Sequence, residues 1–411
     1  MGAETYLRSI LKDYYNSVEV TTVPDIRSRE FGFGEFGKKI SSRHLTFSDN
    51  KQLNFFLRER TPFYISYSNA HYEFPDRRPM EKKILLGADI IYEFDADDIE
   101  TECKLSHDSW VCKSCDAKGK GNLERCPECG FGVKVEEWVC PECVGETKKQ
   151  TQTLLKILEE DFSFNDGISI NFSGSKGFHT HIRGDNIQSL SKAARLELLD
   201  YITATNLDLK SLGFVYSSKK VFHCPKKNVA MGWSKKLLDG IENLLDEGDV
   251  SKISAMASRN KHNVTEGTVK KLLKEKQNIM SGMERGFLLS LPGFKADRFW
   301  ESVLKYIAEE KMLGVDRQTS IDINKIIRVP NTIHGSTGMN AMELSREELP
   351  SFDALKETVV FSGEEVRLMN VTTPKFYIKG NWFGPFTKEE VSLPKYVAFY
   401  LLSRGNAELG V

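Results

Sequence analysis

The stretch Ile90-Ile91-Tyr92-Glu93-Phe94-Asp95-Ala96-Asp97 is an apolar run that ends in two aspartates. Residues two positions apart on a β-strand point to the same face, so Asp95 and Asp97 are predicted to lie side by side on one sheet surface. Two carboxylates this close repel each other unless a cation neutralises them, and a divalent cation is the usual partner. The stretch therefore predicts a strand that holds Mg²⁺ or Mn²⁺, although such a pair, standing alone, is more often a strand that runs into an acidic turn.

The bulk composition limits the possible classes of protein. A chain of 411 residues is long enough for two or three domains, and 40% hydrophobic and 28% charged residues are ordinary for a globular protein. No apolar run approaches the ~20 residues of a membrane span, and no secretory signal is visible, so we expect a cytoplasmic protein without a membrane partner. The net charge of −1 gives no overall cationic field. The basic stretches at 217–236 and 259–295 could track a phosphate backbone or be solvated helix faces.

The cysteines indicate zinc. Seven of the eight fall between residues 103 and 143, and six of these form three Cys-x-x-Cys pairs. In an intracellular chain such pairs favour tetrahedral Zn²⁺ over disulfides, and four protein ligands leave no open position for catalysis. Spacing alone leaves the pairing open, and His107 is the nearest candidate for an eighth ligand. One solution gives two nested structural sites: a ribbon of Cys112, Cys115, Cys126 and Cys129, and an outer site of Cys103, His107, Cys140 and Cys143.

A second polar segment follows the strand-like run 168–172 and reads Ser173-Gly174-Ser175-Lys176-Gly177-Phe178-His179. Its glycines allow close approach of the backbone, and its hydroxyls, lysine and histidine offer hydrogen bonds and positive charge. These features suit a triphosphate, but the spacing is not that of a Walker A loop, and a Gly-Ser hairpin turn explains an isolated match as well. We expect His179 and His181 to face opposite ways, with at most one of them in this site.

A third polar cluster occurs late in the chain. It contains Arg328 and His334, preceded by two acids, Asp316 and Asp322. Either acid could be a further metal ligand, because spacing alone does not choose between them. Taken alone, this segment would be interpreted as a strand and a turn with surface charges.

Together, these segments resemble the catalytic small subunit of the archaeal and eukaryotic DNA primases. Several motifs in the order of that family are far more specific than any one of them. The matching segments are 29–33 (REFGF), 43–47 (RHLTF), 92–97 (YEFDAD), 173–179 (SGSKGFH), 316–338 (from Asp316 through RVPNTIHGSTG), 393–396 (LPKY) and 403–407 (SRGNA).

The resemblance implies template-directed synthesis of short primers on single-stranded DNA from nucleoside triphosphates, with release of pyrophosphate. It makes Asp95, Asp97 and Asp316 the catalytic carboxylates for two Mg²⁺ or Mn²⁺ ions, and it prefers Asp316 to Asp322. It also supports the nested zinc sites, because the zinc site of the family follows the acidic strand and ends in Cys-x-x-Cys before a helix. The implied nucleotide-binding residues are Ser173, Ser175, Lys176, His179, Arg328, His334 and Arg43.

The resemblance further implies an α/β fold, with a mixed sheet that carries the three acids and with an inserted zinc-binding module and helical subdomain. The expected parts are the core at 1–100, 147–204 and 296–411, the zinc module at 101–146 and the helical subdomain at 205–295. A large primase subunit, which carries an iron–sulfur cluster in the family, is the expected partner in a heterodimer.

Two features depart from the family pattern. Ser175 stands where many members have an arginine, so one cationic phosphate contact is expected to be absent. The Cys112–Cys129 ribbon is additional to the minimal zinc site of the family.

Two other functions fit part of this pattern. A repair-type polymerase of the same superfamily would share the catalytic core, but the zinc insertion after the acidic strand argues for a replicative primase. A non-catalytic zinc-ribbon subunit that binds nucleic acid would explain the cysteines and the basic stretches, but not the three separated acids. We therefore expect a DNA-directed nucleotidyltransferase.

Overall fold

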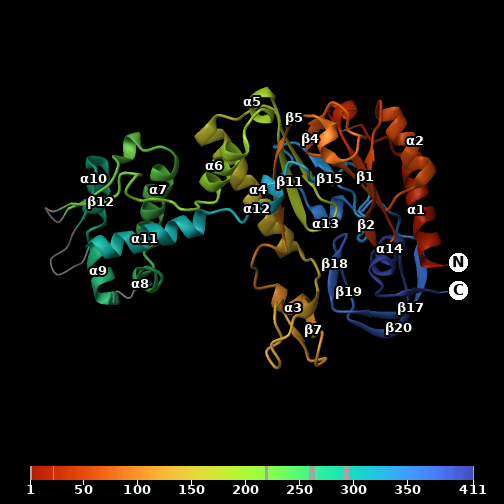
Figure 1. Ribbon diagram of the computed structural model, residues 1–411. Coiled ribbons are helices and arrows are strands. Elements are labelled where there is room, and N and C mark those ends of the chain that lie inside the picture. The colour runs from red at the N-terminus through yellow and green to blue at the C-terminus, as the bar shows by residue number, and fades with distance from the viewer. Residues whose placement is uncertain (1, 22, 218–220, 259–263, 290–295, 411) are drawn as a thin grey trace. The chain divides into compact units, whose positions relative to one another are not determined.

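The computed structural model describes residues 2–21, 23–217, 221–258, 264–289 and 296–410 (Figure 1). Parts of the two basic stretches, and residue 295 at the expected end of the helical subdomain, lie outside these ranges. The contacts divide the chain into two compact units. Unit 1 comprises Met1–Leu155, Asn165–Leu196 and Gly314–Val411, and unit 2 comprises Lys156–Phe164 and Glu197–Leu313.

Unit 1 contains two four-stranded sheets, and the strand pairs in both are antiparallel. The first sheet has the strand order β15 (Ile326–Arg328), β3 (Tyr64–Ser68), β1 (Phe31–Glu35) and β2 (Lys38–Leu45). The second has the order β16 (Glu343–Leu344), β10 (Ile168–Phe172), β11 (Gly177–Ile182) and β6 (Ile90–Asp95). The α/β class is confirmed, with the strands distributed over several small sheets. A short hairpin of β4 (Ala70–Tyr72) and β5 (Leu85–Ala88) precedes β6.

The predicted acidic strand is β6, but it ends earlier than the sequence suggests. Asp95 is the last residue of the strand, and Asp97 lies in the turn that follows. The N–H of Asp97 donates to Oδ1 of Asp95 at 3.1 Å, so the first carboxylate shapes the turn that carries the second. Asp side chains commonly accept such local bonds, which compete with continued strand pairing.

Amphipathic helices cover these sheets. In α1 (Ala3–Ser17), the buried residues Leu7, Ile10, Leu11, Tyr14 and Tyr15 follow helical spacing and form one apolar stripe. The helix α2 begins after Asp49, whose side chain caps it by accepting the N–H of Gln52. Helix α2 spans Asn50–Arg60, and further helices of unit 1 include α5 (Asp185–Gln188), α12 (Arg317–Ile321), α13 (Ala354–Glu357) and α14 (Lys395–Arg404).

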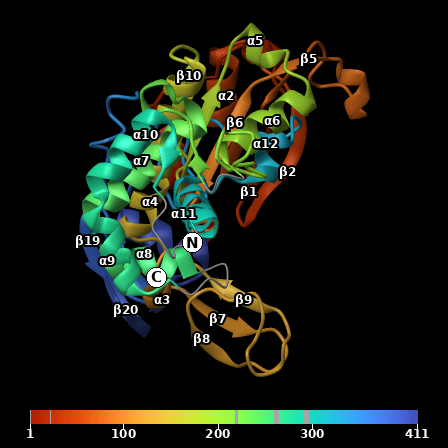
Figure 2. The same ribbon diagram turned by 90° about the vertical axis from the view of Figure 1, so that its left-hand side faces the viewer.

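The cysteine-rich segment is a separate small module between β6 and the long helix α4 (Pro141–Phe162). Its own apolar cluster is small, with Trp110 and Val133 at the centre beside two cysteines. A cluster of this size needs a further stabilising element such as a metal ion. The module consists of α3 (Lys104–His107) and a sheet of β8 (Lys118–Lys120), β7 (Ser109–Cys112) and β9 (Val133–Glu136), shown in Figure 2.

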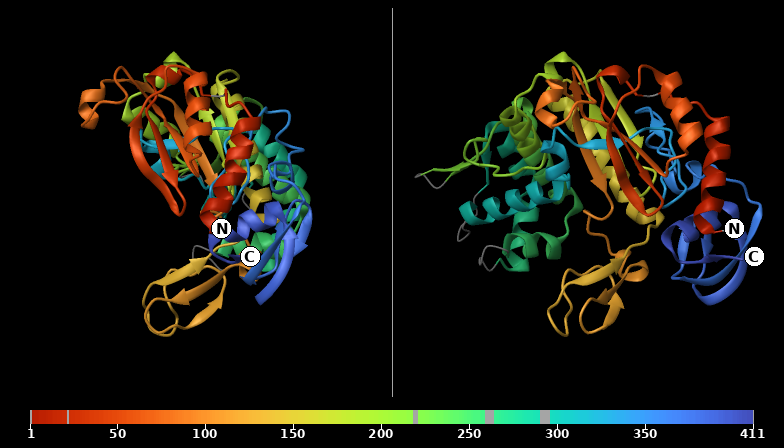
Figure 3. Two further views of the ribbon diagram at one scale, coloured as in Figure 1. Left: turned by 90° about the vertical axis from the view of Figure 1, so that its right-hand side faces the viewer. Right: turned by 45° about the vertical axis from the view of Figure 1, so that its right-hand side comes forward.

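The C-terminal segment returns to the N-terminus, where α14 packs beside α1 in the main core of unit 1 (Figure 3). Residues Tyr396 to Leu402 of α14 are all buried, which explains why this helix is apolar on every side. The strands of the segment are β17 (Glu365–Thr373), β18 (Phe376–Ile378), β19 (Asn381–Phe383), β20 (Phe386–Pro394) and β21 (Glu408–Leu409), in a sheet of order β20-β17-β21 and a hairpin β18–β19.

Unit 2 is mainly helical and has its own core, which includes Trp233, Leu237, Trp300 and Leu304. Gly240 has no side chain because a Cβ there would lie 2.3 Å from Cγ2 of Ile307. Its elements are α7 (Gly232–Glu247), α8 (Val250–Ser258), α9 (Glu266–Lys274), α10 (Lys276–Arg285), α11 (Ala296–Lys311), β12 (Val215–Tyr216), β13 (Phe222–His223) and β14 (Phe287–Leu288).

The chain passes between the units four times, within α4, at residues 164–165, within α6 (Lys192–Ile202) and at residues 313–314. Among the described residues, no helix has the length and apolar character needed to cross a membrane.

Candidate active site and metal centres

Antiparallel pairing brings the polar turn 173–176 to the end of the acidic strand. The turn connects β10 to β11, and in the adjacent pair Gly177 lies opposite Asp95. A side chain at Gly177 is impossible, because its Cβ would lie 2.1 Å from the carbonyl oxygen of Phe94. Oγ of Ser173 accepts the N–H groups of Ser175 (3.3 Å) and Gly177 (3.2 Å), so this hydroxyl fixes the shape of the turn.

Lys176 links the turn to the acids. Its Nζ pairs with the carboxylate of Asp97 and, at 2.5 Å, with Oε2 of Glu137, the residue that directly follows β9 of the zinc module. Burial and the neighbouring Asp97 raise the pKa of Asp95. Burial also raises the pKa of Asp98, with further contributions from Asp95, Asp316 and Asp97. Part of both shifts is repulsion between neighbouring carboxylates, which a bound cation would relieve.

Asp316 lies beside β6, although it comes from a distant part of the sequence. It precedes α12, and its N–H donates to the carbonyl oxygen of Glu93 at 3.3 Å. Nζ of Lys325 lies 3.9 Å from Oδ2 of Asp316 and 3.0 Å from Oε2 of Glu93. The alternative acid, Asp322, lines a different cavity together with Gln188 and Arg195. The structure thus brings Asp316 to Asp95 and Asp97 and leaves Asp322 elsewhere.

Glu93 is a carboxylate of the site that sequence reasoning missed. Its Oε1 lies 3.3 Å from Nε2 of His179, the residue opposite it on β11, and its Oε2 contacts Lys325. Burial alone would raise the pKa of Glu93, but His179 and Lys325 hold it well below its usual value. The same rule that pairs Asp95 with Asp97 places Glu93 on the face of Asp95, so the signal was present in the sequence.

The expectation that His179 and His181 face opposite ways is wrong. They are two residues apart on β11 and share a face, with ring centroids 6.5 Å apart. His181 is fully buried and stacks on Tyr67 of the other sheet. Burial lowers its pKa far below the usual value, so it is neutral there. His179 is therefore the histidine that reaches the acids.

His334 adjoins the turn, and Arg328 lies close to His334. The guanidinium of Arg328 lies 5.2 Å from the ring centroid of Tyr64, and its Nη1 atom is buried without a hydrogen-bond partner in the described part of the chain. Burial lowers the pKa of Arg328 to about 10. His334 is buried, and its Nδ1 lies 3.1 Å from Oγ of Ser336. Burial lowers the pKa of His334 well below its usual value, and so do Arg328, Lys39 and Lys176.

Gly174 is where the two segments touch. The hydroxyl of Thr337 donates to the carbonyl oxygen of Gly174. The backbone of Gly174 has a φ of +76°, and a Cβ there would lie 2.9 Å from Cβ of His334. Only glycine allows both the conformation and the approach. Lys176, Arg328 and Lys39 thus converge on His334, and Lys39 on β2 is a cation that no motif indicated.

Arg43 has different surroundings from the other predicted nucleotide-binding residues. It forms two bonds to the buried carboxylate of Glu30, at 3.0 and 3.2 Å, and donates to the carbonyl oxygen of Asn324 at 3.1 Å. Glu30 also pairs with Lys83 at 3.2 Å. In the described part of the chain, these contacts hold Arg43 within the first sheet and its loops rather than at the turn 173–176.

The eight predicted zinc ligands form two groups of four. In each group, the ligand atoms lie within 4.8 Å of one another. Tetrahedral Zn–S bonds of about 2.3 Å place two sulfurs about 3.8 Å apart. The sulfurs of Cys115 and Cys126 are 3.7 Å apart, and so are those of Cys140 and Cys143. Both groups could hold a metal ion: Cys112, Cys115, Cys126 and Cys129, and Cys103, His107, Cys140 and Cys143.

The outer group has the better supported ligands. Nε2 of His107 points to the sulfur of Cys143 at 3.2 Å, while Nδ1 lies 2.8 Å from Oδ1 of Asp108. A carboxylate on the second ring nitrogen commonly orients a metal-ligating histidine. Asp108 is itself held by the N–H of Trp138 at 2.9 Å. Sulfur and imidazole donors in fours are the ligand set of structural zinc.

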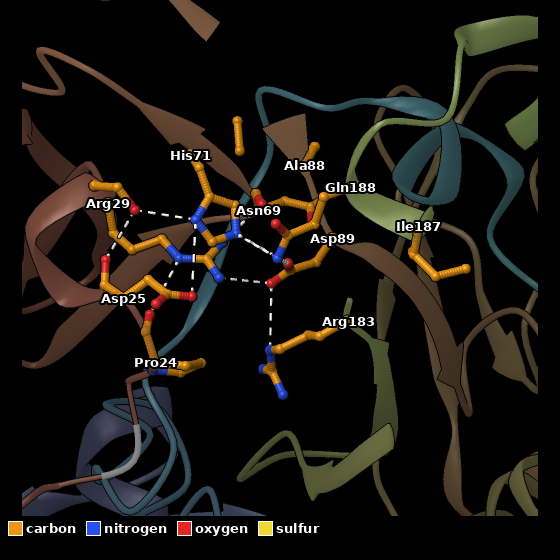
Figure 4. Close-up of polar contacts among 12 residues, drawn as sticks. Pro24, Asp25, Arg29, Asn69, His71, Ala88, Asp89, Arg183, Ile187 and Gln188 are labelled. Carbon is orange, nitrogen blue, oxygen red and sulfur yellow. Dashed lines mark hydrogen bonds and ion pairs between the residues drawn. The ribbon is translucent and has the colours of Figure 1, made fainter. Parts of the chain in front are cut away.

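The other end of β6 is fixed by a buried charge network around Asp89 (Figure 4). Its carboxylate accepts from Arg29 (2.7 Å), contacts His71 (3.0 Å) and Arg183 (3.3 Å), and accepts from Gln188 (3.0 Å). These partners come from the N-terminal segment, the β4 strand, the end of β11 and α5. Asp89 therefore ties together the elements that flank the acidic strand.

Comparison with known proteins identifies the family of the chain. The family model for the DNA primase small subunit matches residues 136–345, just over half of the chain. The DNA primase small subunit PriS of Methanothrix thermoacetophila is 28% identical over 428 aligned residues, which cover 99% of this chain and 98% of the relative. PriS of Nitrosopumilus maritimus is 28% identical over 404 residues, with coverages of 97% and 96%. PriS of Haloarcula marismortui is 24% identical over 420 residues, with 98% of each chain covered. The chain therefore belongs to the DNA primase small subunit family.

Proposed function

We propose that this chain is the catalytic subunit of a DNA primase, which joins nucleoside triphosphates into short primers on single-stranded DNA and releases pyrophosphate. One observation carries the proposal. Asp95 and Asp97 at the end of β6, together with Asp316, lie near the turn 173–176, and Lys176 and the Arg328–His334 segment lie close to the same turn. Acids beside cations suit a reaction that brings metal ions and a polyphosphate together.

The donor set fits Mg²⁺ or Mn²⁺. The three acids offer only carboxylate oxygens, which these hard cations prefer, and the pKa of Asp95 is raised by its burial and by the neighbouring Asp97. Two ions held there would lower the pKa of the attacking 3′-hydroxyl and stabilise the charge on the leaving pyrophosphate.

The chain's own residues would bind and orient the triphosphate. Lys176 can exchange its two carboxylate partners for phosphate oxygens, and Arg328 has a buried donor that no described residue uses. His334 is neutral near pH 7, because its pKa is far below the usual value, so it contributes a hydrogen bond rather than a charge. Ser173 shapes the turn, and its own O–H, like that of Ser175, can donate outward. His179, held by Glu93, completes the proposed set.

The two zinc-type centres would be structural. Each has four protein donors, which leaves no position for substrate. We also propose that the chain assembles with a primase large subunit, as the family pattern implies, and that the template is single-stranded DNA.

Unprimed synthesis on single-stranded DNA, with labelled nucleotides and Mn²⁺, tests the proposal. Asp97→Asn should lower the amount of product by about 100-fold or more, because it removes the negative charge of a proposed metal ligand that also pairs with Lys176. Asp322→Asn is the matched control, since that acid lies nearby in sequence to Asp316 but lines another cavity. The assay is run with and without the co-expressed large subunit.

The outcomes separate the possible functions. Product from the wild type and Asp322→Asn, but not from Asp97→Asn, supports a primase with this site. Extension of an annealed primer without unprimed synthesis would indicate a repair-type polymerase. Inactivity in both assays, with the large subunit present, would favour a non-catalytic nucleic-acid-binding subunit. Normal synthesis by Asp97→Asn would remove Asp97 from the mechanism.

A further inference from the structure

The hairpin β18–β19 has one buried face and one exposed face. Phe376 and Ile378 of β18 belong to the main core of unit 1. Tyr377, which lies between them, points the other way and pairs directly with Trp382 of β19. The two rings are 5.3 Å apart in an edge-to-face arrangement, so they form a small aromatic surface.

Trp382 is exceptional among the tryptophans of the chain. The other four, Trp110, Trp138, Trp233 and Trp300, are at most 6% exposed, whereas Trp382 is 51% exposed. Hydrophobic burial alone therefore does not explain a tryptophan at this position. A large aromatic side chain that stays exposed on a rigid hairpin is suited to contact a ligand.

The surroundings of Trp382 are basic. Nζ of Lys375 lies 5.1 Å from its ring centroid. Residues 374–388 contain three lysines and no acidic residue. Lys375 itself forms no ion pair with another residue in the described part of the chain. An aromatic surface with unpaired positive charge is complementary to a polyanion that also carries flat rings.

Contacts within unit 1 connect the hairpin to the candidate active site. The buried ring of Phe376 lies 5.1 Å from that of Trp138. Trp138 directly follows Glu137, which pairs with Lys176 of the polar turn. The hairpin is thus linked to this turn through Phe376, Trp138 and Glu137.

We propose that Trp382 and Tyr377, together with Lys375, form a binding site for single-stranded nucleic acid. Bases would stack on the two rings, while the lysine contacts the phosphate backbone. Such stacking tolerates any sequence, because every base offers a flat face, and the lysine adds a salt-dependent component. The proposal extends the proposed function but does not require catalysis, since it concerns binding outside the three acids.

Fluorescence anisotropy with a labelled thymidine 20-mer, without metal ions or nucleotides, tests the site. Trp382→Ala should weaken binding by about tenfold, because one stacked base is lost. Trp382→Phe should keep most of the affinity, since it retains a flat ring. Lys375→Ala should weaken binding more at low salt than at high salt. It should also reduce the magnitude of the slope of log K against log salt concentration by about 1.

Two exposed residues of α2 provide matched controls. Phe55 is 64% exposed, and Phe55→Ala removes an aromatic ring of similar accessibility from another surface. Lys51→Ala removes an exposed lysine in the same way. Both variants should bind the oligonucleotide like the wild type, and loss of affinity in them would show that the effect is not specific to the hairpin.

Three results would overturn the proposal. One is wild-type affinity of Trp382→Ala for the 20-mer. Another is loss of affinity in Trp382→Ala that is matched by Phe55→Ala. The third is a Trp382→Ala protein that still binds the oligonucleotide but no longer binds the large subunit or anionic vesicles. That result would assign the surface to a protein or a lipid. Oligonucleotide binding that depends on Trp382 but persists in Asp97→Asn supports the site, even if primer synthesis is never observed.

Discussion

Among single residues, Glu93 has the most informative contacts because it joins three parts of the candidate site. It holds His179 on β11, and it shares Lys325 with Asp316. With Glu93 present, the charge of Lys325 is divided between two carboxylates. We therefore propose that Glu93 is a positioning residue for Asp316.

We expect Glu93→Gln to raise the Mn²⁺ concentration needed for half-maximal primer synthesis by about 10-fold, because Lys325 then pairs more fully with Asp316. A Mn²⁺ titration of activity measures this change. Glu343→Gln, on β16 of the same sheet, is the control and should titrate like the wild type. Adding Lys325→Met to Glu93→Gln should restore part of the Mn²⁺ affinity. An unchanged Mn²⁺ dependence of Glu93→Gln would contradict the positioning role.

Asp89 provides a prediction about stability and pH. Burial alone would raise its pKa, but His71 and Arg29 hold it well below the usual value. A depressed folded pKa stabilises the protein above the unfolded pKa of about 3.9, and this contribution is lost as the pH falls below that value. Asp89→Asn leaves buried Arg29 without its carboxylate, so we expect a loss of about 3–5 kcal/mol at pH 7.

Denaturant unfolding of Asp89→Asn beside the wild type measures this loss. The difference in free energy of unfolding should be constant from pH 6 to 8 and should narrow below about pH 4. Glu390→Gln, which breaks an exposed pair with Arg367, should cost less than about 1 kcal/mol. A small loss for Asp89→Asn, or one that does not change with pH, would show that the network is not a major source of stability.

The sequence identifies some of these residues but not their partners. Asp95 and Lys176 stand in local motifs, so strand periodicity and turn composition are enough to select them. Glu137 and Lys325 act through side chains from distant segments. Their contacts depend on which strands pair, and no local pattern specifies that. Glu93 is the intermediate case, since the alternation of the strand already places it beside Asp95.

At the scale of secondary-structure elements, β6 and the polar turn follow from local sequence, but their sheet does not. The run 90–95 forms the predicted strand, and the side chain of Asp95 ends it by accepting the N–H of Asp97. The order β16-β10-β11-β6 joins segments separated by more than 200 residues, which local periodicity cannot specify. The family resemblance implies an α/β fold with a mixed sheet, and the strand pairing distributes the strands over several small antiparallel sheets.

The zinc module allows an element-scale prediction about metal content. Mass spectrometry under non-denaturing conditions should find two zinc ions in the wild type. Cys115→Ser should lose one zinc and disorder only the ribbon, because that group has its own sheet and two exposed ligands. Cys143→Ser should lose the other zinc and also lower the melting temperature of unit 1. The ligands of this outer group lie at the start of α4 and beside the acidic turn, so their loss affects the core of the unit.

A control and a contrary result complete this test. Cys224→Ser, in unit 2 and outside both groups, should keep both zinc ions. A single zinc in the wild type, or loss of both ions from Cys115→Ser alone, would contradict two separate structural centres.

At the scale of the whole molecule, the two units have separate hydrophobic cores. The three acids, the polar turn and Arg328 all belong to unit 1, while unit 2 contributes none of them. A ligand that binds the candidate site therefore stabilises the folded state of unit 1 directly.

This division predicts how calorimetric unfolding responds to ligands. Mn²⁺ and a nucleoside triphosphate together should raise the unfolding temperature of unit 1 by several degrees. A ligand at 100 times its Kd adds about 2.7 kcal/mol to the free energy of unfolding. Either ligand alone should raise this temperature less, because the metal ions and the negatively charged phosphates would attract each other in the same site. The transition of unit 2 should move little.

Asp95→Asn should abolish the joint effect, whereas Asp322→Asn should retain it. Equal shifts of both transitions would show that the two units unfold as one, and no shift of either would exclude a combined metal and nucleotide site at these acids.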